Sequence, residues 1–70
     1  MPEGTVRWFD PKKGYGFIQP KDGGADVFVH ISALHRSNLE GLNEGEQVGY
    51  ELETDPRTNK QKAANLVIIS

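Results

Sequence analysis

The sequence of 70 residues has no cysteine and only two histidines. Without cysteine the protein forms no disulfide bond and carries out no thiolate chemistry, and neither histidine stands in a pattern of metal ligands. No nucleophile has an evident base, and no paired carboxylates share an apolar setting. We therefore expect no metal, no cofactor, no catalytic residue and no enzymatic activity.

Long hydrophobic runs are also missing. The longest, Leu66 to Ile69, is far too short to span a bilayer, and the N-terminus lacks a basic start followed by an apolar stretch. We therefore expect a soluble, cytoplasmic protein. A chain of this length forms a single domain, residues 1–70, and such a small domain buries only about 60% of its unfolded surface.

Positive charge is in short supply, with eight Lys and Arg against ten Asp and Glu. This balance argues against a nucleic-acid partner at first, because cations usually neutralise the phosphates. The charge is unevenly distributed, however. Residues 1–36 carry five basic and four acidic side chains, whereas residues 37–70 carry three and six. The acidic remainder should restrict a polyanion to the first half of the chain.

The stretch from residue 12 to 19, Lys-Lys-Gly-Tyr-Gly-Phe-Ile-Gln, organises the chain. Side chains alternate across a strand, so Tyr15 and Phe17 share one face and Ile18 points to the other. Burial explains Ile18. Two rings on the opposite, otherwise polar face require either a second layer of protein or a ligand with flat surfaces, and so short a chain offers little second layer.

A second stretch, residues 26–31, shows the same alternation of aliphatic and aromatic side chains. Its three aliphatic side chains face one side, while Phe28 and His30 face the other. Residues 20–25 between the two stretches have a turn composition, which predicts an antiparallel hairpin. With Ile18 and the aliphatic residues inside, the hairpin collects four rings on its outer face: Tyr15, Phe17, Phe28 and His30.

Flat rings beside lysines suit single-stranded nucleic acid, because every base has a π face and every nucleotide a phosphate. Stacking contributes about 1–3 kcal/mol per base. Lys13 abuts the aromatic strand and is the better candidate for a phosphate contact. Lys12 is explained equally well as a solvated turn residue.

Two short motifs carry a family resemblance. Residues 13–18 (KGYGFI) are similar to the first RNA-binding signature, and residues 27–30 (VFVH) look like its companion. In the RNA-recognition-motif fold the companion comes first and two helices are required, so the order found here excludes that fold. Preceded by residues 4–9 (GTVRWF) and followed by 63–66 (AANL), the two motifs resemble the cold-shock domain. The resemblance runs from about residue 3 to 66 and is closest to a stand-alone bacterial-type cold-shock protein.

The rest of the chain predicts three more strands and a long connection. Alternation marks strands over residues 4–10, 46–54 and 62–69, and a single helical turn at 31–34 precedes a loop over 35–45. The side chains expected inside are Val48, Tyr50 and Leu52 in the fourth strand and Ala64, Leu66 and Ile68 in the last. This pattern predicts an all-β fold, a five-stranded antiparallel OB-fold barrel with no long helix, whose middle strands bind oligonucleotides.

The position of Trp8 leaves two alternatives open. With Val6 in the core, strict alternation turns Trp8 inward, as a plain core tryptophan. The resemblance instead implies that Trp8, and in part Phe9, lie on the binding face. Both rings reach that face only if the strand bends or bulges near Arg7.

The resemblance implies a binder of single-stranded RNA and DNA, pyrimidine-rich by preference and monomeric. It also implies an RNA chaperone and a regulator of transcription or translation. Binding only the unpaired state shifts RNA folding by mass action, without ATP. The residues expected to bind nucleic acid are Arg7, Trp8, Phe9, Lys13, Tyr15, Phe17, Asp26, Phe28, His30, Ile31, Leu39 and Lys62.

Three residues depart from the family pattern. Asp10 stands where asparagine is usual, Ile31 where phenylalanine is frequent, and Leu39 where an aromatic residue is common. The chain therefore gains a carboxylate and loses two rings at the expected surface, and each change should weaken binding.

The alternative function, from another class than nucleic-acid binding, is that of a small barrel that binds a protein segment. A proline-rich segment could lie in an aromatic groove. Lys13 and His30 beside the rings favour phosphates and base edges. A groove for proline-rich peptides would instead carry acidic residues among the rings to meet basic ligands.

Overall fold

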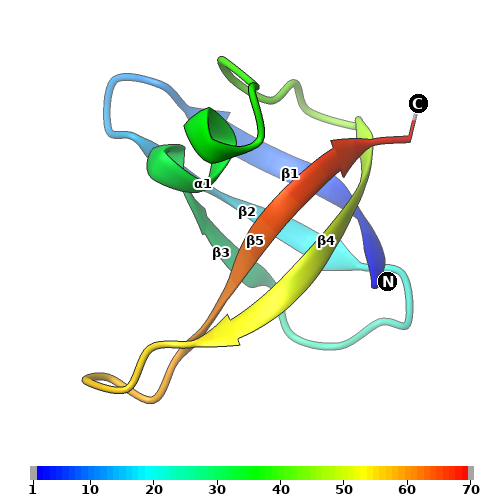
Figure 1. The fold of residues 1–70 in the computed structure, drawn as a ribbon. Helices are drawn as coiled ribbons and strands as arrows, with labels where there is room; N and C mark the ends of the chain where they lie inside the picture. Colours follow the sequence, from blue (N-terminus) through cyan, green and yellow to red (C-terminus); the bar gives the residue numbers. More distant parts are fainter. Residues whose placement is uncertain (1, 70) are drawn as a thin grey trace.

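The computed structural model describes residues 2–69 and shows a closed barrel of five strands in the order β1-β2-β3-β5-β4 (Figure 1). The strands are β1 (Glu3–Asp10), β2 (Tyr15–Pro20), β3 (Val27–His30), β4 (Gln47–Thr54) and β5 (Gln61–Ile68). The short helix α1 (Ile31–Arg36) follows β3. The predicted five-stranded OB-fold barrel is confirmed. Within residues 2–69, no helix is long and apolar enough to cross a membrane.

One of the five strand pairings is parallel. β1 pairs antiparallel with β2 and with β4, and the β2–β3 and β4–β5 pairings are also antiparallel. An odd number of strands cannot alternate in direction all the way around a closed ring. At least one pairing must therefore be parallel. In this barrel it is the pairing of β3 with β5, in which Phe28 lies opposite Lys62.

The inward side chains of all five strands meet in one core, and Leu34 of α1 lies fully buried in it. The predicted inward position of Tyr50 is confirmed, since its side chain is buried. Burial raises the pKa of the Tyr50 hydroxyl, as expected for a phenol withdrawn from water. The buried hydrophobic residues are Val6, Ile18, Val27, Val29, Leu34, Leu42, Val48, Tyr50, Ala63 and Leu66.

A bulge in β1 decides the position of Trp8. Val6 pairs with Ile18, but the next pair joins Trp8 to Phe17, so Arg7 is an extra residue in β1. A bulge of this kind bends the strand and shifts its alternation by one residue. Val6 is consequently buried, while Trp8 lies outside with 37% of its surface exposed. The predicted bulge near Arg7 is confirmed, and the alternative of a core tryptophan is wrong.

A second irregularity changes the inward set of β5. The register of β5 against β4 shifts between Val67 and Ala64, and Asn65 there has a positive φ of 49°. The buried residues of β5 are therefore Ala63 and Leu66. The predicted inward positions of Ala64 and Ile68 are wrong. The left-handed Asn65 interrupts the alternation between Ala63 and Leu66, which leaves Ala64 out of the buried set. Ile68 keeps the phase of Leu66, but 37% of its surface is exposed at the end of β5.

The prediction for Leu52 is also wrong, for a different reason. Leu52 is in phase with buried Tyr50, yet 44% of its surface is exposed. The β4–β5 hairpin extends beyond the other strands, and its tip projects from the barrel (Figure 1). The side chain of Leu52 is therefore exposed to solvent although it has the inward phase, because no strand from the opposite side of the barrel covers it there.

Candidate nucleic-acid interface

Five rings from the first three strands gather on one outer face. Trp8 lies opposite Phe17, and Phe17 lies opposite Phe28, which makes one row across the sheet. Tyr15 and His30 form a second cross-strand pair beside this row. We call this set the aromatic platform: Trp8, Tyr15, Phe17, Phe28 and His30.

The rings of the aromatic platform buttress one another. The Trp8 centroid is 5.4 Å from that of Phe17 and 5.6 Å from that of Tyr15. Phe28 lies 5.8 Å from Phe17 and 6.4 Å from His30. The contacts are tilted or edge-to-face, which aromatic pairs prefer. Rings held in this way lose little conformational freedom when a ligand binds.

Two glycines allow the backbone conformation that positions these rings. A Cβ on Gly16 would lie 2.3 Å from the Trp8 carbonyl oxygen and 2.8 Å from the Phe9 Cα atom, so only glycine allows β1 and β2 to approach so closely. Gly14 adopts a positive φ of 80° where β2 begins, and its carbonyl accepts a hydrogen bond from the Ile31 amide at 2.8 Å. Gly14 thereby ties the start of β2 to the start of α1.

Arg7 and Asp26 form an ion pair on the same outer face. The Arg7 Nε donates to Asp26 Oδ1 at 3.1 Å and lies 2.9 Å from Oδ2. Arg7 reaches Asp26 because it is the extra residue of the β1 bulge. The structure thus brings together these two predicted site residues. Asp26 neutralises much of the charge that Arg7 would otherwise offer to phosphate.

Asp10 shapes the turn that carries the predicted cation Lys13. Its Oδ1 accepts hydrogen bonds from the amides of Lys12 at 2.9 Å and Lys13 at 3.2 Å. This is an Asx turn, in which the carboxylate satisfies backbone donors. Both lysine side chains are exposed. Lys13 lies in this turn two residues before Tyr15, whose partner in β1 is Asp10.

The remaining predicted residues divide into two groups. Lys62 lies opposite Phe28 and extends the first row of rings onto β5. Phe9, Ile31 and Leu39 are instead partly buried, and they pack against the core. These three residues therefore present less surface to a ligand than Trp8 and His30, which are exposed.

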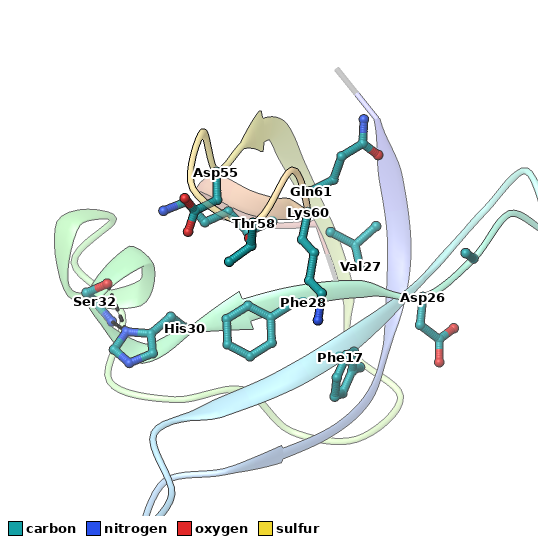
Figure 2. Close-up of a pocket in the computed structure, with 12 residues that line it drawn as sticks. Phe17, Asp26, Val27, Phe28, His30, Ser32, Asp55, Thr58, Lys60 and Gln61 are labelled. Atoms are coloured by element: carbon teal, nitrogen blue, oxygen red, sulfur yellow. Dashed lines mark hydrogen bonds between the residues drawn. The ribbon is translucent and has the colours of Figure 1, made fainter.

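A groove of about 740 Å³ runs beside the aromatic platform (Figure 2). Phe17, Phe28 and His30 line one side, and the β4–β5 connection lines the other. The connection contributes Asp55, Thr58 and Lys60, and the start of β5 adds Gln61 and Lys62.

From the sequence, residues 55–59 are a turn between the last two strands with no expected part in binding, so their place at the groove was missed. Two signals were present: in OB-folds the connection between strands 4 and 5 helps to bind oligonucleotides, and this connection carries Arg57 and Lys60. The Asp55 carboxylate accepts a hydrogen bond from the Arg57 amide at 2.8 Å, which lowers the pKa of Asp55. Asp55 thus shapes the loop as an ionised carboxylate.

Among the described residues, no three His, Cys, Asp or Glu side chains lie close enough together to hold a metal ion. The groove instead offers rings, backbone and a few cations. These groups can stack on flat molecules and contact phosphates.

The class that fold and site define is a small OB-fold barrel with an aromatic outer face. The family model described as "'Cold-shock' DNA-binding domain" matches residues 2–69. The chain is 54% identical over 66 residues to "Probable cold shock protein y4cH" of Sinorhizobium fredii, and 50% identical over 66 residues to "Cold shock protein CspA" of Rhizobium meliloti. Each alignment covers 94% of this chain and 96% of the relative. The chain therefore belongs to the cold-shock domain family.

Proposed function

We propose that this protein binds single-stranded RNA and DNA by stacking bases on the aromatic platform. The observation that carries the proposal is the arrangement of five outward rings on three strands, in contact with one another and beside Lys62. Membership of a family described as DNA-binding supports it. The ligand is pyrimidine-rich and the protein acts as a monomeric single domain in the cytoplasm.

The low positive charge gives stacking the larger share of the binding free energy. Arg7 is paired with Asp26, which leaves Lys13 and Lys62 as the main cations of the predicted site. Each phosphate contact adds about one unit to the slope of log K against log salt. Binding should therefore weaken only modestly as salt is raised.

The same chemistry supports a role as an RNA chaperone and as a regulator of transcription or translation. Paired bases hide the faces that the rings contact, so the protein binds the unpaired state alone. A ligand specific for one state shifts the equilibrium toward it. RNA hairpins would open by mass action, with no ATP and no covalent step.

Fluorescence of Trp8, the only tryptophan, tests this function. Oligothymidine and oligouridine of seven nucleotides should bind and quench Trp8, with oligoadenine weaker and a duplex of equal length far weaker. Equal affinity for the duplex and the single strand would overturn the stacking mechanism. A proline-rich peptide serves as the other arm, and its binding in place of the oligonucleotides would show a protein-docking barrel.

Chaperone action needs a separate measurement. An RNA hairpin labelled with a fluorophore and a quencher at its ends should open as protein is added, in the absence of ATP. A matched hairpin locked by a covalent cross-link serves as the control. A locked hairpin that responds equally would show that the signal does not report unfolding.

A further inference from the structure

His30 has two structural roles at once. It ends β3 as a member of the aromatic platform, and it is the N-cap residue of α1 with an extended backbone. Its Nδ1 accepts a hydrogen bond from the Ser32 amide at 3.1 Å and lies 2.9 Å from the Ser32 hydroxyl (Figure 2). One ring therefore connects the helix to the proposed binding face.

These contacts determine which ring nitrogen carries the proton. A backbone N–H can only donate, so Nδ1 must present its lone pair to Ser32. A neutral imidazole then holds its single proton on Nε2. The Ser32 hydroxyl lies near the same Nδ1 atom and further restricts rotation of the ring. The cap thus fixes both the orientation and the tautomer of His30.

The His30 ring also lines the groove beside the aromatic platform. Phe28, the cations of Lys60 and Lys62, and the carboxylates of Asp26 and Asp55 line the groove with it. Within residues 2–69, Nε2 takes part in no side-chain hydrogen bond, so its proton is available to a ligand. A ring N–H without a protein partner is suited to an oxygen acceptor of a ligand.

We propose that Ser32 is a positioning residue, which holds His30 so that Nε2–H donates to an oxygen of bound nucleic acid. The acceptor is a phosphate oxygen or a base carbonyl. The inference rests on the proposed function for its ligand, but its first step, the fixed ring, is a property of the free protein. His30 therefore stacks and donates, and Ser32 acts through it.

Nitrogen NMR of the free, ¹⁵N-labelled protein at pH 8, above the ordinary range of histidine, tests the first step. The expected result is a scalar coupling across the hydrogen bond between the Ser32 amide nitrogen and His30 Nδ1, with Nδ1 unprotonated and Nε2 protonated. Ser32→Ala should weaken the coupling by loosening the ring, and Ser32→Thr should restore it. A wild-type spectrum with the proton on Nδ1 would overturn the inference.

A double-mutant cycle tests the second step. Ser32→Ala should lower the affinity for oligothymidine about two- to tenfold, the usual worth of one hydrogen bond. His30→Phe keeps a ring for stacking but has no nitrogen, so Ser32→Ala should have no further effect in that background. An equal loss in both backgrounds would show that Ser32 only stabilises α1, and no loss in either would equally overturn the proposal.

Oligothymidine with methylphosphonate linkages distinguishes the two acceptors. The effect of Ser32→Ala shrinks on this ligand if a phosphate oxygen is the acceptor, and it persists if the acceptor is a base carbonyl. Failure of every variant to bind oligonucleotides would overturn the proposed function together with the donor step. An absent coupling with normal binding would overturn only the inference about Ser32.

Discussion

The wall formed by β1, β2 and β3 and the wall formed by β4 and β5 share one core but present different outer faces (Figure 1). The first wall carries rings in mutual contact. The second carries the exposed aliphatic side chain of Val67 together with Glu51 and Glu53. Because both walls bury their inward residues in the same core, the outward residues distinguish the proposed binding wall from the other.

The charges follow the same division. Lys13 stands in the turn before Tyr15 on the first wall, and Lys62, although it belongs to β5, lies opposite Phe28 at the edge of that wall. The outer face of β4 is acidic instead, and Glu51 is held there by a hydrogen bond from the Asn65 side chain. We therefore expect a polyanion to be attracted to the first wall and repelled by the outer face of β4, although the net charge of the protein is −2.

The largest effect should come from the core that both walls share. Ile18 is fully buried, whereas its neighbour Phe17 points outward. Ile18→Ala should lower the free energy of unfolding by about 2–5 kcal/mol, because it removes transfer free energy and leaves a cavity. Urea denaturation measures this loss.

Phe17→Ala is the matched control for Ile18→Ala, since it truncates the adjacent residue on the opposite face. It should leave most of the stability in place. If Phe17→Ala unfolds the protein and Ile18→Ala does not, the assignment of inward and outward faces is wrong.

The next largest effect concerns binding and compares the two walls directly. Phe28→Ala removes a half-buried ring from the centre of the aromatic platform and should weaken oligothymidine binding by about 1–3 kcal/mol. Val67→Ala removes an exposed side chain from the second wall and should leave affinity unchanged. Titration of Trp8 fluorescence measures both variants. An equal loss in the two would mean that both walls bind.

A smaller effect is expected at the three departures from the family pattern. Ile31→Phe and Leu39→Phe extend aromatic surface at partly buried positions, and each should tighten oligothymidine binding by up to about 1 kcal/mol. Asp10→Asn removes a charge but keeps an oxygen that can accept from the Lys12 and Lys13 amides. Its effect should be greatest at low salt.

Affinities at two salt concentrations decide the outcome for these three variants. Urea denaturation is the control, because the larger phenylalanine side chain at position 31 could also disturb the packing beside Gly14. Unchanged binding in all three, with stability intact, would show that these positions lie off the path of the nucleic acid.

Much of the binding wall could be predicted from the sequence, because period-two alternation in β2 and β3 is unbroken. Tyr15, Phe17 and Ile18 take the sides that this pattern assigns to them. The sequence also predicted the β1 bulge, since the resemblance placed Trp8 outside while Val6 had to lie inside. Local pattern and tertiary structure agree over this half of the chain.

The second wall could not be predicted so well, for two physical reasons. Asn65 adopts a left-handed conformation that no alternation pattern reveals, so the inward set of β5 changes at that residue. The length of the β4–β5 hairpin relative to the barrel depends on the other strands, and the local pattern around Leu52 carries no information about it. For the same reason the sequence did not predict that Lys60 lines the groove.

The smallest effect tests whether the alternation pattern or the position in the barrel decides how much a leucine contributes to stability. Leu52→Ala should change the free energy of unfolding by no more than about 0.5 kcal/mol, because the side chain is 44% exposed beyond the barrel. Leu66→Ala, the same substitution at a buried position of the paired strand, should cost about 2–5 kcal/mol. Urea denaturation of the two variants makes the comparison. Similar losses at both positions would mean that the hairpin folds back over Leu52 in solution, and that alternation alone had located the core correctly.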